Sequence, residues 1–104
     1  MAIYVTSDAH GHVRALDEAL SKISLTSDDT LYVLGDMIDR GPDPVGVIKL
    51  VRSLPNARVL KGNHEQIMLD AIIGQDPLDA ETWDINGGWT TREQLNDMEF
   101  EAYE

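Results

Sequence analysis

Three segments of the chain repeat the same order: a short apolar run, a polar loop and an amphipathic stretch. The predicted strands cover Ala2–Val5, Leu31–Leu34 and Ala57–Lys61, of which the first two are apolar throughout and the third contains Arg58 and Lys61. Helical spacing predicts helices over Val13–Ile23, Asp43–Leu54 and Glu65–Ile73. Runs that are apolar throughout are typical of parallel strands, because such strands are buried on both faces. The repeated order therefore predicts an α/β fold, in which βαβ units build a parallel sheet with flanking helices.

Beyond Gly74 the hydrophobic pattern weakens, and only one more helix is predicted. It covers Thr91–Phe100 and begins with a threonine as its N-cap. The 104 residues suit one domain and leave no room for a second.

Composition excludes several classes of protein. The formal net charge of −11 repels nucleic acid and anionic membranes, so neither is expected as a partner. The chain has no cysteine, which rules out a disulfide scaffold and a thiolate metal site. The start of the chain lacks the basic region and the long apolar run of a signal peptide. No apolar run approaches the roughly 18 residues that span a membrane, and we expect a cytoplasmic protein.

Polar side chains follow each of the three predicted strands. The loops read SDAHGH, GDMIDRGPD and GNHEQ, and they lie 26 and 27 residues apart, counted from His10 to Asp36 and from Asp36 to Asn63. One βα unit is about that long, and parallel strands end at the same edge of a sheet. The side chains expected to meet at this edge are Asp8, His10, Asp36, Asp39, Arg40, Asn63 and His64.

Carboxylate, imidazole and amide groups supply oxygen and nitrogen ligands, which suit Mn²⁺, Fe or Zn²⁺. Asp36 lies on the middle loop and is placed to bridge two ions. Two ions about 3.5–4 Å apart can polarise a phosphoryl group and generate hydroxide near neutral pH. Arg40 can form paired hydrogen bonds with phosphate oxygens. Asp39 can hold an imidazole in its charged form, ready to donate a proton.

Each loop taken alone also has a plain structural interpretation. Asp8 can be a helix N-cap, and Asn63 can cap the helix whose first turn contains Glu65. Trp83 fits either a core position or the wall of a pocket. Asn86, with the two glycines after it, predicts a turn that could also touch a substrate. The order and even spacing of the three loops favour a site over coincidence.

The motifs resemble a known family. Asp8-x-His10, then Gly35-Asp36-x-x-Asp39-Arg40-Gly41, then Gly62-Asn63-His64-Glu65 resemble the metallophosphoesterase signature. The Asp39-Arg40-Gly41 ending resembles the phosphoprotein phosphatase branch, which includes bacterial and phage serine/threonine phosphatases and symmetrical diadenosine tetraphosphatases. The segment Trp83–Thr91 resembles the Trp-x-x-Asn-Gly-Gly segment of the bacterial and phage members. The resemblance extends from about Ile3 to Thr91.

The resemblance implies a calcineurin-like sandwich and a hydrolase of phosphate monoesters, in particular a serine/threonine protein phosphatase. Its substrates would be phosphorylated proteins or small phosphoesters, and its cofactors two divalent ions, with Mn²⁺ expected ahead of Fe or Zn²⁺. The implied roles are as follows: Asp8 and His10 bind the first metal, Asp36 bridges both, Asn63 binds the second metal and contacts the phosphate, Arg40 holds the phosphate, and His64, oriented by Asp39, protonates the leaving oxygen.

The end of the chain departs from the family pattern. The pattern continues with two further metal-binding histidines in a β-rich half, but no histidine follows His64 here. We therefore expect residues 1–104 to be the N-terminal part of a single metallophosphoesterase domain. By itself this part would be inactive and could self-associate. Two rival functions remain: a symmetrical diadenosine tetraphosphate hydrolase, or an inactive fragment that binds one metal or a partner chain.

Overall fold

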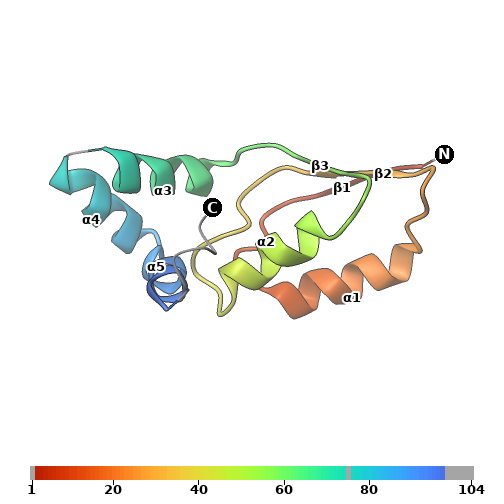
Figure 1. Ribbon diagram of the computed structural model, residues 1–104, viewed down its shortest axis with the longest axis horizontal. Helices are drawn as coiled ribbons and strands as arrows, with labels where there is room; N and C mark the ends of the chain where they lie inside the picture. Colours follow the sequence, from red (N-terminus) through yellow and green to blue (C-terminus); the bar gives the residue numbers. More distant parts are fainter. Residues whose placement is uncertain (1, 75, 98–104) are drawn as a thin grey trace.

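The computed structural model describes residues 2–74 and 76–97. It contains three strands and five helices (Figure 1). In chain order these are β1 (Ile3–Thr6), α1 (Val13–Ile23), β2 (Thr30–Val33), α2 (Pro44–Arg52), β3 (Ala57–Val59), α3 (Asn63–Ile73), α4 (Pro77–Ile85) and α5 (Trp89–Asn96). The strands pair in parallel in the order β1-β2-β3. The predicted α/β class with a parallel sheet is confirmed.

The first three predicted helices and all three predicted strands are present, with small shifts at their ends. Helix α1 has the predicted bounds. Helix α2 begins at Pro44, because the Asp43 side chain caps it by accepting a hydrogen bond from Gly46 N at 3.0 Å. Helix α3 begins at Asn63, two residues earlier than predicted. The Glu65 carboxylate accepts a hydrogen bond from Gly62 N at 2.9 Å and closes the first turn.

One face of the sheet forms the core. The sheet residues Leu31 and Val33 pack there against the helices α1 and α2, and Ile38 and Val47 are completely buried. In the parallel register Tyr4, Leu31 and Ala57 lie side by side across the three strands. This packing fixes the strands, and with them the loops that leave their carboxyl ends.

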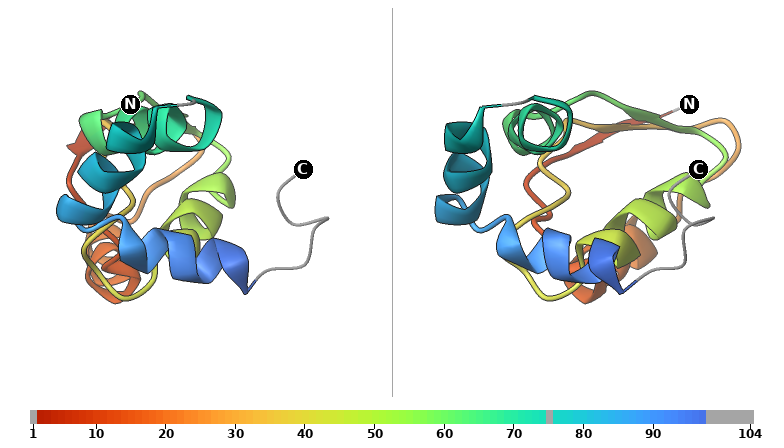
Figure 2. Two further views of the ribbon diagram at one scale, coloured as in Figure 1. Left: turned by 90° about the vertical axis from the view of Figure 1, so that its left-hand side faces the viewer. Right: turned by 60° about the vertical axis from the view of Figure 1, so that its left-hand side comes forward.

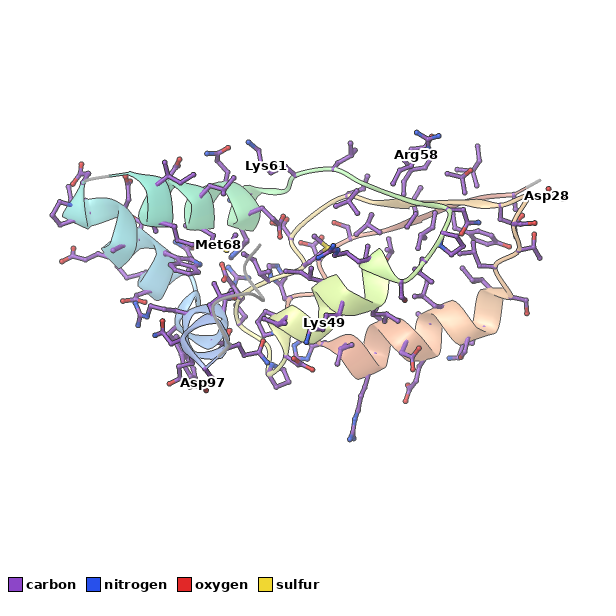
Figure 3. The ribbon with its side chains drawn as sticks, in the orientation of Figure 1. Asp28, Lys49, Arg58, Lys61, Met68 and Asp97 are labelled. Carbon is purple, nitrogen blue, oxygen red and sulfur yellow. The ribbon has the colours of Figure 1, made fainter. Side chains whose placement is uncertain are left out.

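The opposite face of the sheet is uncovered among the described residues. Helices α1 and α2 lie on the same side (Figures 1 and 2), as expected when right-handed crossovers add successive strands in one direction. Ile3 and Val5 are each 61% exposed, and Arg58 points to the uncovered side (Figure 3). The expectation that these strands are buried on both faces is therefore not met within residues 2–74 and 76–97.

Two helices follow Gly74, and the sequence predicted only one. Helix α4 begins at Pro77, and Asp76 caps it by accepting a hydrogen bond from Leu78 N at 2.9 Å. Helix α5 begins at Trp89 after Gly88, so the predicted threonine cap is wrong; the end predicted for this helix, residues 98–100, lies outside the described residues. No helix in the described part of the chain is long and apolar enough to cross a membrane.

Candidate active site

The loops after β1 and β2 bring three predicted ligands together. Asp8, His10 and Asp36 each offer one ligand atom, and these atoms lie within 4.8 Å of one another. His10 Nε2 is 3.5 Å from Asp8 Oδ1. Two carboxylates and an imidazole form a donor set that suits a divalent ion of the Mn²⁺, Fe or Zn²⁺ type. The residues present therefore fit a metal ion.

A hydrogen bond fixes the orientation of the His10 ring. His10 Nδ1 lies 2.8 Å from the Ile38 carbonyl oxygen, which can only accept, so Nδ1 carries the proton. In a neutral imidazole this leaves Nε2 unprotonated, on the side of Asp8, as a ligand nitrogen must be. The backbone joins the same two loops, since His10 N donates to Asp36 O at 3.0 Å.

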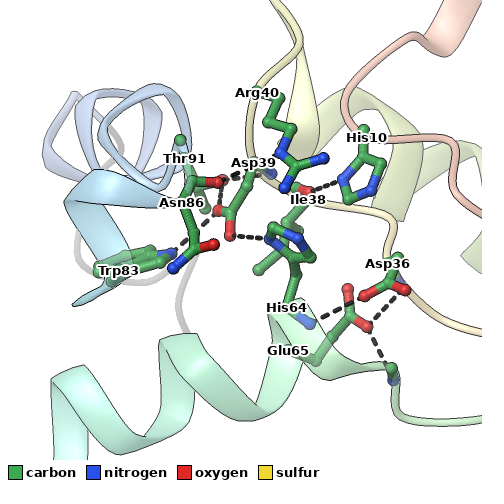
Figure 4. Close-up of polar contacts among 12 residues, drawn as sticks. His10, Asp36, Ile38, Asp39, Arg40, His64, Glu65, Trp83, Asn86 and Thr91 are labelled. Atoms are coloured by element: carbon green, nitrogen blue, oxygen red, sulfur yellow. Dashed lines mark hydrogen bonds and ion pairs between the residues drawn. The ribbon is translucent and has the colours of Figure 1, made fainter. Parts of the chain in front are cut away.

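Glu65 holds the Asp36 loop, a role that its place in the motif did not indicate. Its Oε1 accepts hydrogen bonds from Asp36 N at 2.6 Å and from Gly62 N at 2.9 Å, and its Oε2 accepts one from Met37 N at 2.9 Å. His64 N donates to Asp36 Oδ1 at 2.8 Å and fixes that carboxylate from the other side. The first turn of α3 thus sets the position of the predicted bridging ligand (Figure 4).

Left-handed backbone conformations coincide with the predicted site. Asp8, His10, Asp36, Asp39 and Arg40 have φ between 41° and 72°, and among the described residues Ser24 is the one other non-glycine residue with positive φ. Non-glycine residues adopt this region infrequently, because it crowds Cβ against the backbone. Strained residues of this kind cluster at functional sites, where the surrounding structure holds them in place.

A buried hydrogen-bonded pair of an imidazole and a carboxylate lies beside the three ligands. His64 Nδ1 is 2.8 Å from Asp39 Oδ2, and the two side chains are 7% and 0% exposed. The His64 and His10 rings meet edge to face with their centroids 4.6 Å apart. Because Nδ1 is engaged by a carboxylate, Nε2 is the ring nitrogen left to exchange a proton with a substrate.

Two residues from the C-terminal helices complete the surroundings of Asp39. Its Oδ1 accepts hydrogen bonds from Trp83 Nε1 at 2.9 Å and from Thr91 Oγ1 at 2.8 Å (Figure 4). Trp83 is buried, with 4% of its surface exposed; it also lines a cavity with Ala80 and Leu95, and its N–H reaches a site residue. No sequence pattern indicated the contact between Thr91 and Asp39.

The remaining predicted residues lie at the rim. Arg40 is exposed; its backbone N donates to Gly87 O at 2.9 Å and its Nε to Asn86 O at 3.4 Å. Asn86 lies in the predicted turn between α4 and α5.

Asn63 is exposed as the first residue of α3, directly before His64. The structure therefore places Asn63 next to a residue that contacts Asp36, while its own ligand role stays a prediction.

Comparison with known proteins identifies the family. The family model for calcineurin-like phosphoesterases (Metallophos) matches residues 1–102. The chain belongs to the calcineurin-like phosphoesterase family. The family recognised from the three loop motifs is confirmed.

Three relatives illustrate the range of this phosphoesterase family. The chain is 38% identical over 76 residues to the symmetrical bis(5'-nucleosyl)-tetraphosphatase of Pectobacterium carotovorum. This match covers 71% of this chain and 27% of that protein. It is 38% identical over 92 residues to serine/threonine-protein phosphatase 1 of Salmonella typhimurium, covering 86% and 41%. The crystal structure of a metallophosphoesterase from Sphaerobacter thermophilus matches with a TM-score of 0.63 at 30% identity, covering 95% of this chain and 37% of that chain.

The phosphoesterase chain spans between 27% and 41% of the length of these curated relatives. The match to the family model, over residues 1–102, contains all three loops of the candidate site.

Proposed function

We propose that this chain supplies the metal-binding and proton-donating groups of a two-metal phosphomonoesterase that acts on phosphoserine and phosphothreonine in proteins. One observation carries the proposal: the three-ligand group of Asp8, His10 and Asp36 lies beside the buried His64–Asp39 pair, with the two histidine rings 4.6 Å apart. A metal-ligand set next to a carboxylate-oriented imidazole is the combination that phosphoester hydrolysis needs.

Each residue then has a defined task. Asp8, His10 and Asp36 hold the first divalent ion, Asp36 and Asn63 contribute to the second, and Mn²⁺ is the proposed metal. When bound, such ions polarise a phosphoryl group and make water more acidic. His64 donates a proton from Nε2 to the leaving alkoxide oxygen, while Asp39 keeps the ring in place through Nδ1.

Phosphate binding is assigned to the rim of the site. Arg40 is exposed, and its backbone is fixed by the hydrogen bond from its N to Gly87 O. Its guanidinium can form paired hydrogen bonds with phosphate oxygens. Asn63 adds an amide from the neighbouring loop, so two loops contribute to holding the phosphate.

The extent of the matches supports a protein phosphatase. The similarity to serine/threonine-protein phosphatase 1 covers 86% of the chain, against 71% for the tetraphosphatase. A symmetrical dinucleoside tetraphosphate hydrolase is the second candidate, because several of the relatives carry that name. Assaying a phosphoserine peptide and diadenosine tetraphosphate with the same preparation separates the two.

We further propose that residues 1–104 alone bind one divalent ion well and hydrolyse phosphate esters poorly. The second ion would have Asp36 and Asn63 as its ligands from this chain, too few to hold it firmly beside another cation. The uncovered sheet face around Ile3 and Val5 is the surface through which this chain would self-associate.

A histidine substitution tests the proposed function. In the complete gene product that contains residues 1–104, His64→Asn should lower kcat on an alkyl phosphate by about 10²- to 10⁴-fold, the typical contribution of a general acid. The loss should be smaller on p-nitrophenyl phosphate, whose leaving group needs the proton less. His12→Asn is the matched control, because His12 is exposed and its side chain forms no capping hydrogen bond. Equal losses on both substrates would refute the general-acid role.

A further inference from the structure

The carboxylate of Asp39 is completely buried, and both of its oxygens have partners. Its Oδ2 lies 2.8 Å from His64 Nδ1, and its Oδ1 accepts hydrogen bonds from Trp83 Nε1 at 2.9 Å and from Thr91 Oγ1 at 2.8 Å. We propose that Trp83 and Thr91 are positioning residues: they hold Asp39 in the one orientation that keeps its Oδ2 on His64. This inference rests on the proposed function, because it concerns the same proton donor.

Geometry shows why Asp39 needs these partners. The torsion that rotates an aspartate carboxylate is broad and roughly two-fold, so burial alone does not define the plane of the group. Two donors from two different helices on one oxygen do define it. A buried carboxylate is also costly without such donors, because it has left water.

Thr91 forms hydrogen bonds with both the backbone and the side chain of Asp39. Its Oγ1 accepts a hydrogen bond from Asp39 N at 2.9 Å and donates its single proton to Asp39 Oδ1 at 2.8 Å. The reciprocal pair closes a ring around a residue whose φ is +72°. The hydroxyl thus fixes the strained backbone of Asp39 as well as its carboxylate.

The segment between the two helices is shaped for this contact. Gly88 lies between Trp83 and Thr91, and a Cβ at this position would be 2.1 Å from Trp83 Cδ1. A side chain there would push the indole away from Asp39. The Trp-x-x-Asn-Gly-Gly segment therefore lets α4 and α5 approach the same oxygen (Figure 4), which gives this part of the chain a task that the loop motifs do not explain.

The kinetic test uses two substitutions in the complete gene product loaded with Mn²⁺: Thr91→Val, which is near-isosteric, and Trp83→Phe, which puts a smaller ring without a donor in place of the indole. Thr91→Val and Trp83→Phe each remove one donor to Oδ1, and each should lower kcat on an alkyl phosphate by about 10- to 100-fold, part of the general-acid contribution. KM should stay within about twofold, because substrate binding does not use these residues. Thr91→Ser keeps the hydroxyl and should restore most of kcat.

Thr90→Val is the matched control on the same helix. Thr90 is also buried, but its Oγ1 donates to Gly87 O at 3.3 Å and forms no hydrogen bond with Asp39. It should leave kcat close to that of the unmodified protein. If Thr90→Val lowers kcat as much as Thr91→Val, the effect belongs to helix α5 in general and the proposal is overturned.

A double variant separates positioning from general damage. In a His64→Asn background, Thr91→Val should cause no further loss of kcat, because Thr91 acts through His64. If Thr91→Val lowers kcat as much in the His64→Asn background as it does alone, the proposal for Thr91 is overturned. The proposed function would still hold in that case, provided that His64→Asn alone lowers kcat strongly. If His64→Asn has no effect, the proposed function and this inference fall together.

A spectroscopic readout is independent of activity. In the 104-residue chain the Trp83 indole N–H should exchange slowly with water, whereas that of Trp89, which is 51% exposed, should exchange fast. Asp39→Ala should accelerate exchange at Trp83 and leave Trp89 unchanged, as followed by proton NMR. Equal exchange at both indoles in the unmodified chain would show that the bond to Asp39 is not formed and would overturn the proposal.

Discussion

Replacing Glu65 with alanine removes the acceptor for three backbone N–H groups at once. These groups belong to Asp36, Met37 and Gly62, at distances of 2.6, 2.9 and 2.9 Å from the carboxylate oxygens. The substitution leaves every proposed metal ligand in place. It therefore asks whether the position of Asp36, and not only its presence, is needed to bind a metal.

The size of the effect follows from these contacts. A hydrogen bond to a charged group contributes about 1.5–3 kcal/mol. Glu65 is half-buried, so water can replace part of what is lost. We expect the free energy of unfolding to fall by about 2–4 kcal/mol, a large share of the 5–15 kcal/mol typical of a domain. We expect metal affinity to fall by about 10- to 100-fold, as when a residue that supports a ligand is lost.

Urea unfolding of the 104-residue chain and Mn²⁺ titration by calorimetry measure both quantities. Glu65→Gln should fall between the two forms, because its amide oxygen can still accept hydrogen bonds while its NH₂ group cannot. Glu81→Ala is the control, since Glu81 is exposed on α4. If Glu65→Ala and Glu81→Ala have the same urea midpoint and the same Mn²⁺ affinity, the support role of Glu65 is wrong.

Three further outcomes are expected for the stability of the chain. Gly35→Ala should destabilise it by about 3 kcal/mol or more, because φ is +89° and a Cβ would lie 2.2 Å from a backbone nitrogen of the next loop; unchanged thermal unfolding would contradict this. Leu31→Ala, at a position 2% exposed, should lower the free energy of unfolding by about 2–5 kcal/mol, and a loss below about 1 kcal/mol in urea would show that the core is packed differently. Backbone hydrogen bonds, first from Thr26 and then from Ala2, lower the pKa of Asp29. The contribution of Asp29 to stability is therefore present above the unfolded pKa of about 3.9 and is lost as pH falls through the lower folded pKa. Between about pH 5 and pH 2 the urea midpoint should fall less in Asp29→Asn than in the unmodified chain, and the same fall in both would contradict this.

The sequence predicts the sheet and the convergence of its loops well, because both depend on short-range patterns. Apolar runs at regular intervals specify parallel strands, and parallel strands leave their polar ends at one edge. Asp8, His10 and Asp36 therefore meet as their spacing predicted. Helix α4 was missed, although Asp76 followed by a proline is a recognisable helix start, because its apolar residues do not form a continuous stripe.

The supporting contacts could not be predicted, since they join residues far apart in the chain. Thr91 reaches Asp39 across 52 residues, and Trp83 does so across 44. Glu65 satisfied a local expectation as a first-turn acid of α3, which hid its contacts with the Asp36 loop. Threonine before a polar stretch suggests a helix cap; here the helix begins earlier, and the hydroxyl is free to bind a buried carboxylate.

The most direct test of the metal site is a Mn²⁺ titration of the 104-residue chain by calorimetry. We predict one site of high affinity, which His10→Ala weakens by more than the roughly 10- to 100-fold expected for a supporting residue, while His12→Ala leaves it unchanged. No binding, or an affinity that does not depend on His10, would contradict the claim that these loops form a metal centre. Two tight sites with robust phosphatase turnover would contradict the proposal that the second site is incomplete in this chain.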